Sequence, residues 1–279
     1  MPTLFDEAPY LSVFGLKEPP YSTKPNERYL YFTPPHQEAL AMVGKALREK
    51  EGGVLVYGNF GTGKTTLMRR IFAELRDHDS EIRVAVIENG GHCPTEFQLA
   101  GEVIESFGQK TQSSSRKGRY DQVKQLLFDN HQAGLTSVLL IDEAQELPAK
   151  VLESLRGYLN YETNEEKILQ IILFALPSIT RKLAYAKTLR DRLWRSELRG
   201  LSRAELAEML RWRYRQAGGT VFPFEETTLD RLHILTAGLP RAACGLAQLA
   251  LEVAALGNGH VTSDIVESVK DKRFLEGAT

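Results

Sequence analysis

The sequence predicts an α/β fold in which a parallel sheet is flanked by helices, followed by a small all-helical domain. Apolar runs of strand length alternate with stretches of helical spacing, which is typical of a parallel sheet covered on both faces. The runs lie at residues 54–57, 82–87, 137–141 and 168–175. After residue 202 only helical stretches follow, at about 202–216, 225–237, 240–256 and 262–271. We therefore expect an N-terminal segment at 1–33, an α/β domain at 34–201 and a helical domain at 202–279.

The N-terminal segment combines prolines with aromatic rings, among them Phe14, Tyr21, Tyr29 and Tyr31. We expect an irregular segment that packs on the core through these rings, because aromatic side chains are large apolar anchors. A second interpretation is that the rings form a wall of a ligand pocket.

Residues typical of helix ends stand between the expected strands. Pro34 and Pro35 suit the first turn of a helix, which Gly52 and Gly53 end before the first strand. Further helices are expected at 94–107, at about 120–133, from Pro148 onward and, after the capping box Ser202-Arg203-Ala204-Glu205, to about Gln216. The segment between the first two of these, at 108–119, is expected to be a polar and basic loop.

A glycine-rich turn joins the first strand to a helix and matches the pattern G-x-x-x-x-G-K-[ST] of a phosphate-binding loop. Its glycines allow the backbone N–H groups to face inward and form an anion site at a helix N-terminus. Lys64 is expected to reach the β- and γ-phosphates, and the Thr65 hydroxyl to ligate Mg²⁺. The predicted nucleotide-binding residues are Gly58, Asn59, Phe60, Gly61, Thr62, Gly63, Lys64, Thr65 and Thr66. The pattern predicts a bound nucleoside triphosphate and does not distinguish ATP from GTP.

A second part of this site follows the strand at 137–141, where Asp142 and Glu143 stand together. Asp142 is expected beside the Mg²⁺, as a metal ligand with Thr65. Glu143 is expected to polarise the attacking water as the general base. Gln145 and Glu146 follow at the border of the site and receive no assigned role.

Composition excludes several classes of protein. The net charge of −1 and the charged fraction of 25% are ordinary for a globular protein, and no apolar run approaches the length of a membrane span. The N-terminus lacks the features of a secretory signal, and Cys93 and Cys244 make no metal-type pair. We therefore expect a cytoplasmic protein with reduced thiols.

Basic residues are concentrated in two stretches. Residues 181–215 hold eleven Lys/Arg against four Asp/Glu, and residues 110–124 hold five against one. Such stretches can neutralise the phosphates of duplex DNA, although a solvated face is the alternative. The candidate DNA contacts are Lys110, Thr111, Arg116, Lys117 and Arg119.

Several motifs together resemble an AAA+ ATPase: the phosphate loop, the Asp142-Glu143 strand end and Gly238-Leu239-Pro240-Arg241. More narrowly, Phe14-Gly15-Leu16, Ile141-Asp142-Glu143-Ala144-Gln145 and Leu169-Gln170-Ile171-Ile172-Leu173 resemble the ExeA/GspA-like group, which is related to transposition ATPases of the TnsC, TniB and MuB type. The resemblance implies ATP as the nucleotide, a five-stranded sheet of order 5-1-4-3-2 and a helical lid. It also implies a homo-oligomer, as a ring or helical filament, with its sites between subunits.

The resemblance assigns roles to two arginines. Arg241 matches the lid arginine that senses the γ-phosphate, with a surface helix cap as the alternative. Arg192 matches the finger that acts on a neighbouring subunit, with Arg190 and Arg195 as alternatives. A polar sensor is expected near Leu176, where this chain has no polar side chain, and this departure predicts slow hydrolysis.

Two functions follow as expectations. In the first, ATP-bound subunits assemble on double-stranded DNA as a switch for transposition or target selection, with transposase and target-selector proteins as partners. In the second, the ATPase serves assembly of a secretion or type IV pilus machine, or acts as a nucleotide-gated scaffold. Secretion members of the group continue into a membrane span, so the end of this chain at the lid favours the DNA function.

Overall fold

A computed structural model describes residues 9–23, 31–78, 80–163 and 166–272 of the chain. Contacts between Cα atoms divide these residues into two units. The α/β unit comprises 34–58 and 64–198. The helical unit comprises the described residues of 1–33, 59–63 and 199–279.

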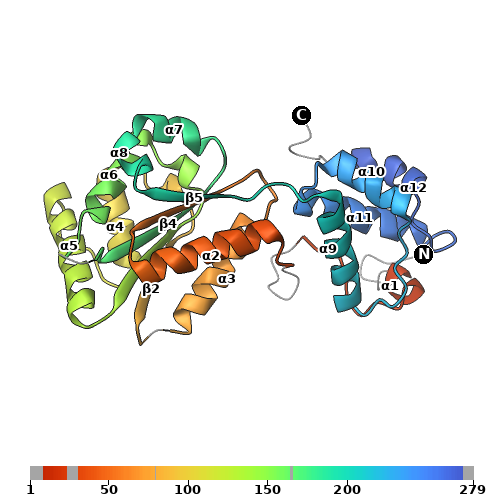
Figure 1. Ribbon diagram of the computed structural model, residues 1–279, viewed down its shortest axis with the longest axis horizontal. Helices are drawn as coiled ribbons and strands as arrows, with labels where there is room; N and C mark the ends of the chain where they lie inside the picture. The colour runs from red at the N-terminus through yellow and green to blue at the C-terminus, as the bar shows by residue number, and fades with distance from the viewer. Residues whose placement is uncertain (1–8, 24–30, 79, 164–165, 273–279) are drawn as a thin grey trace. The chain divides into compact units, whose positions relative to one another are not determined.

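The α/β unit alternates strands and helices, as the sequence predicts (Figure 1). Its elements are α2 (Pro34–Glu49), β1 (Gly53–Tyr57), α3 (Lys64–Arg76), β2 (Ile82–Ile87), α4 (Glu96–Ser106), α5 (Arg116–Gln132), β3 (Thr136–Ile141), α6 (Ala149–Leu159), β4 (Leu169–Ala175), α7 (Ile179–Tyr185), α8 (Lys187–Arg190) and β5 (Leu193–Glu197). Two short 3₁₀ turns, η2 (Gly90–His92) and η3 (Ala144–Glu146), follow β2 and β3.

All strand pairs in the sheet are parallel, and the strand order is β2-β3-β4-β1-β5. This confirms the expected five-stranded sheet of order 5-1-4-3-2. The fifth strand carries no clear signal in the sequence, because Leu193 and Ser196 are its only buried residues and the others are exposed. Such a pattern is expected of a strand at the edge of a sheet, where only part of each face is covered.

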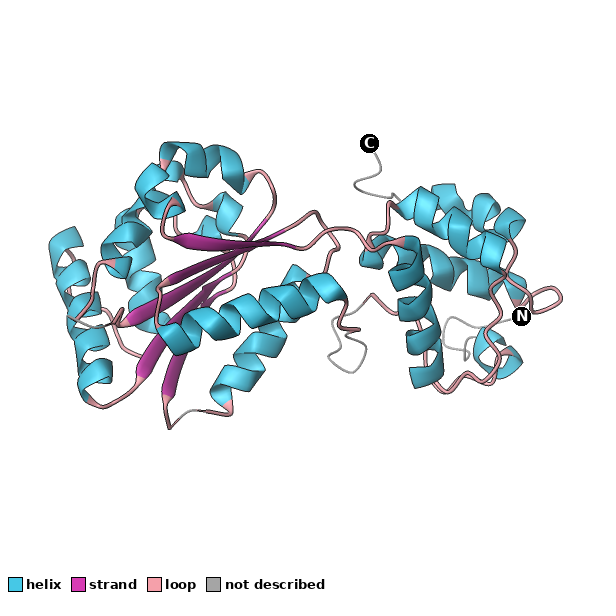
Figure 2. Cartoon of the chain, viewed as in Figure 1, coloured by secondary structure: helices cyan, strands magenta, loops and turns pink. Residues whose placement is uncertain are grey.

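Helices cover both faces of the sheet (Figures 1 and 2). Successive side chains of a strand point to opposite faces. Leu55, Leu139 and Leu173 therefore share one hydrophobic cluster with residues of α4 to α8. The other face is covered by α2 and α3, which contact β1, β2 and β4. The core is thus continuous along the sheet, and the loops at the strand ends are left to carry the site.

The basic segment predicted as a loop at 108–119 is shorter than expected, and this part of the prediction is wrong. Helix α5 begins at Arg116, four residues before the predicted start near 120. The Ser115 hydroxyl accepts a hydrogen bond from the Gly118 N–H at 3.0 Å and caps the helix. Capping satisfies an N–H group that has no partner within the helix. Arg116, Lys117 and Arg119 therefore lie on a helix.

The helical unit contains α1 (Pro9–Val13), α9 (Arg203–Gln216), α10 (Glu226–Thr236), α11 (Pro240–Ala254), α12 (Ser263–Val269) and the 3₁₀ turn η4 (Lys270–Lys272). Its described residues form no β-strand (Figure 2). The capping box predicted at Ser202 and Glu205 is present. Bonds from Arg199 hold the pKa of Glu205 at about 2.

The N-terminal segment packs differently from the prediction. The described rings Tyr10 and Tyr21 are buried in the hydrophobic cluster of the helical unit rather than in the cluster under the sheet. The Tyr21 hydroxyl donates to the Leu210 carbonyl at 3.2 Å, and the Tyr31 ring lies 5.7 Å from Trp212. Tyr29, also predicted as an anchor, lies outside the described residues. Apolar positions on α9 and α11 provide the surface that these rings cover.

None of the helices among the described residues combines the length and the apolar character needed to cross a lipid bilayer.

Candidate functional site

The glycine-rich turn lies between the end of β1 and the start of α3, which begins at Lys64. The Gly58 N–H donates to the Ala175 carbonyl at 3.1 Å, so the turn starts beside the end of β4. Gly61 and Gly63 have φ angles of +76° and +99°, in the left-handed region that favours glycine. The local structure is therefore the strand, loop and helix that an anion site of this type requires.

Lys64 is the first residue of α3, directly after this turn, and is 6% exposed. Its Nζ atom donates to the Gly58 carbonyl at 2.8 Å. Burial lowers the pKa of Lys64, and the carboxylates of Glu143 and Asp142 act in the opposite direction. The ammonium group is thus partly desolvated and stands in the field of two acids.

Thr65 and Asp142, the two predicted metal ligands, are in direct contact. The Thr65 hydroxyl donates to Asp142 Oδ2 at 2.8 Å, across 77 residues of sequence. The Glu143 N–H donates to Asp142 Oδ1 at 2.9 Å. Burial raises the pKa of Asp142, which is 4% exposed. A hydroxyl and a carboxylate are oxygen groups of the kind that Mg²⁺ binds, so these residues fit the metal.

Glu143 adopts a left-handed backbone conformation, with φ 49° and ψ 38°. This conformation is uncommon for a residue other than glycine. The turn is closed by the Glu146 N–H, which donates to the Glu143 carbonyl at 2.8 Å. Gly90 packs against the same carbonyl, where an added Cβ would lie 2.8 Å from the oxygen. The Glu143 side chain is therefore presented from a tightly constrained turn.

Sequence reasoning assigned no role to Gln145, yet this residue is buried beside Glu143. Its Nε2 atom donates to Glu143 Oε2, and its Oε1 atom accepts from the Leu176 N–H at 2.8 Å. The Asp-Glu-x-Gln spacing is visible in the sequence, but the contact with Leu176 spans 31 residues. Only the pairing of β3 with β4 brings the two strand ends together.

The helical unit holds the middle of the turn and Arg241. The Arg241 N–H donates to the Gly61 carbonyl at 3.2 Å. A Cβ on Gly61 would lie 2.8 Å from the Arg241 Cβ, so the close approach requires glycine. The Thr62 hydroxyl donates to the Asn59 carbonyl at 2.9 Å, while the Phe60 ring is 52% exposed. Thr66 lies half-buried in the first turn of α3.

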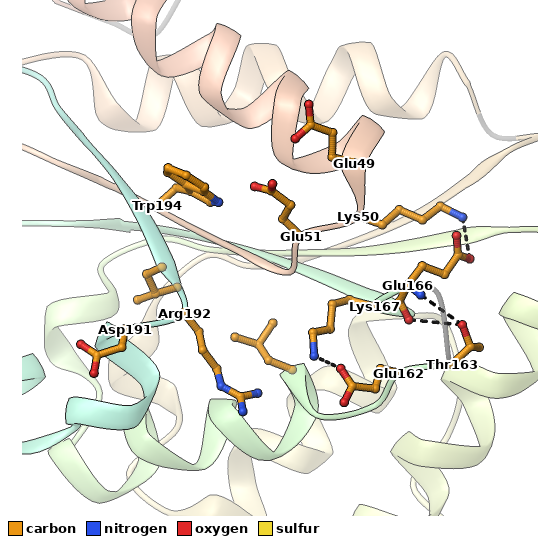
Figure 3. A pocket seen from close by; sticks show the side chains of 12 residues that line it. Glu49, Lys50, Glu51, Glu162, Thr163, Glu166, Lys167, Asp191, Arg192 and Trp194 are labelled. Carbon is orange, nitrogen blue, oxygen red and sulfur yellow. Dashed lines mark hydrogen bonds and ion pairs between the residues drawn. The ribbon is translucent and has the colours of Figure 1, made fainter.

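Arg192 precedes β5 at the side of the sheet where the parallel strands begin, here called the amino edge. Leu193, the first residue of β5, pairs there with Gly53, the first residue of β1. The phosphate-binding turn follows the other end of β1. At the rise per residue of a parallel strand, the two ends of β1, Gly53 and Tyr57, lie about 13 Å apart. Arg192 donates to Asn160 Oδ1 and lines a pocket of about 910 Å³ (Figure 3). Of the two alternative arginines, Arg190 pairs with Asp191 at 3.0 Å and Arg195 is exposed on β5. Arg192 is therefore remote from the turn of its own chain.

The five candidate DNA contacts do not form one equivalent group. Arg119 lies over the Phe97 ring at 3.6 Å and donates to the Ser113 and Phe97 carbonyls at 3.2 and 3.1 Å. Arg116 forms an ion pair with Glu96 at 2.9 Å. Lys110 and Lys117 are exposed, and Thr111 is partly exposed. Arg119 thus joins the loop to α4, and the lysines present the charge to solvent.

Comparison with known proteins defines the class of the fold. Residues 47–183 match the family model described as AAA domain. The chain resembles Cdc6p from Pyrobaculum aerophilum, with a TM-score of 0.65 and 17% identity over 93% of this chain and 72% of that one. For the ORC2 protein of Aeropyrum pernix the TM-score is 0.62, with 19% identity over 89% and 72%. The α/β unit therefore has the P-loop AAA+ fold.

A more similar sequence is the General secretion pathway protein A of Aeromonas hydrophila. The chain is 36% identical to it over 254 residues, which is 90% of this chain and 45% of the relative. The chain is homologous to this protein over most of its own length. It spans less than half of the relative's length.

Proposed function

We propose that this protein is an ATP hydrolase that uses Mg²⁺ and self-associates when ATP is bound. The observation that carries the proposal is the contact between Thr65 and Asp142, next to Lys64 and Glu143. A phosphate-binding turn, an oxygen pair suited to Mg²⁺ and a carboxylate for water activation are the parts that phosphoryl transfer to water requires.

Each residue has a distinct part in this mechanism. Lys64 would bind the β- and γ-phosphates, and a partly desolvated ammonium attracts them more strongly than a hydrated one. Thr65 and Asp142 would hold the Mg²⁺, which neutralises phosphate charge when bound. Glu143 would accept the proton of the attacking water. Arg241, whose N–H is bonded to Gly61, would sense the γ-phosphate.

Substitution of Lys64 tests the nucleotide site. Lys64→Ala should abolish both the binding of a fluorescent ATP analogue and nucleotide-dependent self-association in light scattering. Lys45→Ala, at an exposed lysine of α2, should leave both unchanged. Chelation of Mg²⁺ with EDTA should stop hydrolysis in the unsubstituted protein. Full nucleotide affinity in the Lys64→Ala protein would refute the proposal.

We propose that this ATPase acts as a switch on double-stranded DNA, in transposition or target selection. Its partners would be transposase and target-selector proteins. The exposed lysines Lys110 and Lys117 support this function, because ammonium groups neutralise backbone phosphates. A neighbour in fold, the ORC1 protein of Aeropyrum pernix, has been solved in complex with DNA. Because the activity needs ATP and Mg²⁺, we place it in the cytoplasm.

Duplex DNA should stimulate ATP hydrolysis, and the stimulation should fall steeply with salt. The double substitution Lys110→Ala and Lys117→Ala should weaken it, whereas a pair of alanines at Lys45 and Lys150, exposed lysines outside both basic stretches, should not. A hydrolysis rate that is insensitive to DNA would contradict the DNA function and leave the ATPase proposal intact.

A second candidate function is assembly of a secretion or type IV pilus machine. The 36% identity to General secretion pathway protein A favours it. Co-purification with inner-membrane assembly proteins, together with a rate that DNA does not change, would select this function over the first.

A further inference from the structure

Gln145 connects the carboxylate of Glu143 to the end of the neighbouring strand β4. It lies in the turn η3, directly after β3, and is 5% exposed. Its amide spans two groups: Nε2 donates to Glu143 Oε2, and Oε1 accepts from the Leu176 N–H at 2.8 Å. Because β3 and β4 are parallel neighbours, their carboxyl ends lie side by side and one side chain can join them.

The orientation of this amide is determined by its partners. The Leu176 N–H can only donate, so the amide oxygen must face it. The NH₂ group then faces Glu143, which accepts as a carboxylate, with Glu146 Oε1 at 3.4 Å from the same nitrogen. A buried amide with satisfied oxygen and nitrogen has little freedom to rotate, because a flip would place donor against donor.

The backbone around Gln145 is also held in place. The Lys182 ammonium, from α7, donates to the Gln145 carbonyl and to the Leu147 carbonyl at 2.9 Å. Leu147 and Ala144 belong to the hydrophobic cluster under the sheet. The amide therefore projects from a fixed turn towards a fixed strand end.

This contact falls where the chain lacks a polar side chain at the end of β4. The residues there, Phe174-Ala175-Leu176-Pro177, present none. The only hydrogen-bonding groups that they offer are backbone groups, and the Leu176 N–H is occupied by Gln145. A polar group thus reaches the end of β4 from the strand next to it.

We propose that Gln145 is the positioning residue for Glu143 in the proposed ATP hydrolysis, on which this inference rests. The amide binds one carboxylate oxygen and leaves Oε1 of Glu143 for the attacking water. An amide does not take up a proton near neutral pH, so it orients the base without competing for the proton. Correct orientation of a catalytic group increases the reaction rate by large factors, and a displacement of about 1 Å can lower the rate by about 100-fold.

Two substitutions test this role. Gln145→Ala removes the connection, and kcat should fall by about 10- to 100-fold. The KM for ATP and the affinity for a non-hydrolysable analogue should stay within about twofold, because no contact with the nucleotide is lost. Gln145→Glu keeps the shape and the acceptor for Leu176 but cannot donate to Glu143 when ionised. Its kcat relative to the unsubstituted protein should be low at neutral pH and rise as the introduced carboxyl group is protonated.

Gln170 provides a matched control at the other end of β4. It is 1% exposed, its Oε1 accepts from the Gly52 N–H at 2.8 Å, and its Nε2 donates to the Lys167 carbonyl at 2.9 Å. Gln170→Ala also removes a buried amide bound to a backbone N–H, so it should lower the melting temperature like Gln145→Ala. It should leave kcat unchanged.

The outcomes separate the two proposals. If the unsubstituted protein hydrolyses ATP in a Lys64-dependent manner and Gln145→Ala matches its kcat, the positioning role is wrong and the ATPase proposal stands. An increase in kcat would make Gln145 a brake and overturn the inference. An equal fall in Gln170→Ala would assign the loss to general destabilisation. Absence of hydrolysis in the unsubstituted protein would refute both proposals.

Discussion

The two edges of the sheet in the α/β unit each hold a buried glutamine whose oxygen accepts from a backbone N–H. At the amino edge, Gln170 donates to a backbone carbonyl, so both of its bonds hold main chain. At the carboxyl edge, Gln145 donates to the carboxylate of Glu143. The same type of side chain therefore holds main chain at one edge, as Gln170, and orients a candidate base at the other, as Gln145.

The charged groups at the two edges also differ, in how far they are buried. At the carboxyl edge, burial raises the pKa of Asp142 and lowers that of Lys64. At the amino edge, the ion pairs Lys50–Glu166 and Lys167–Glu162 line a wide pocket beside Arg192 (Figure 3). Desolvated charge is costly and is typical of a functional site, whereas partly exposed ion pairs contribute little. We propose that the carboxyl edge is organised for chemistry within the chain, and that Arg192, which donates to Asn160 Oδ1 at the amino edge, acts on another copy.

The largest effect among the substitutions that preserve nucleotide binding is expected at the amino edge. Arg192→Ala should lower the ATPase rate of the oligomer by about 1,000-fold, the lower range for a trans-acting arginine. ATP affinity should be unchanged, because Arg192 lies at the opposite strand end from Lys64. Arg190→Ala and Arg195→Ala should have small effects.

Mixing experiments test whether this arginine acts between copies. A mixture of Arg192→Ala and Glu143→Gln subunits should regain activity, because a site with intact Glu143 can receive Arg192 from its neighbour. Absence of such complementation would assign Arg192 to the structure of its own chain and remove the functional contrast between the edges.

At the carboxyl edge, Glu143→Gln should lower kcat by about 100-fold or more, the usual contribution of a general base. ATP binding should persist, and the assembled state should have a longer lifetime in size-exclusion chromatography with ATP. The control is Glu162→Gln at the amino edge, which breaks the pair with Lys167 and should leave kcat unchanged. If Glu143→Gln alters neither assembly nor its lifetime, the protein is a nucleotide-gated scaffold.

The smallest effect concerns stability. Burial raises the pKa of Asp142 in the folded chain, so ionisation of this group opposes folding. The cost is present above the folded pKa and is lost as pH falls below the unfolded value. Without Mg²⁺, Asp142→Asn should therefore raise the melting temperature at pH 7 slightly, by less than any of the rate effects above would suggest. The gain should disappear near pH 3, and Asp191→Asn at the exposed amino edge should show none.

A lower melting temperature for Asp142→Asn at pH 7 would mean that the bonds from Thr65 and Glu143 outweigh the burial of the charge. The carboxyl edge would then be a stabilising network rather than a site that trades stability for function.

Several elements could be predicted from local sequence because their signals are local. The strand at 82–87 and the cap at Ser202 were found where the sequence places them. Strand β5 was not located, because an edge strand with three exposed residues has little apolar signal. The start of α5 was missed because the Ser115 cap competes with a run of residues that suits a loop equally well.

The sequence alone determined the phosphate-binding turn, its glycines and the acids that follow a buried strand, because these features depend on residues adjacent in the chain. The tertiary structure decided that Gln145 reaches Leu176, that the N-terminal rings join the helical unit and that Arg119 packs on Phe97. These contacts join segments separated by more than 20 residues, and no local preference specifies them. They arise when strand pairing and side-chain packing bring distant segments to the same place.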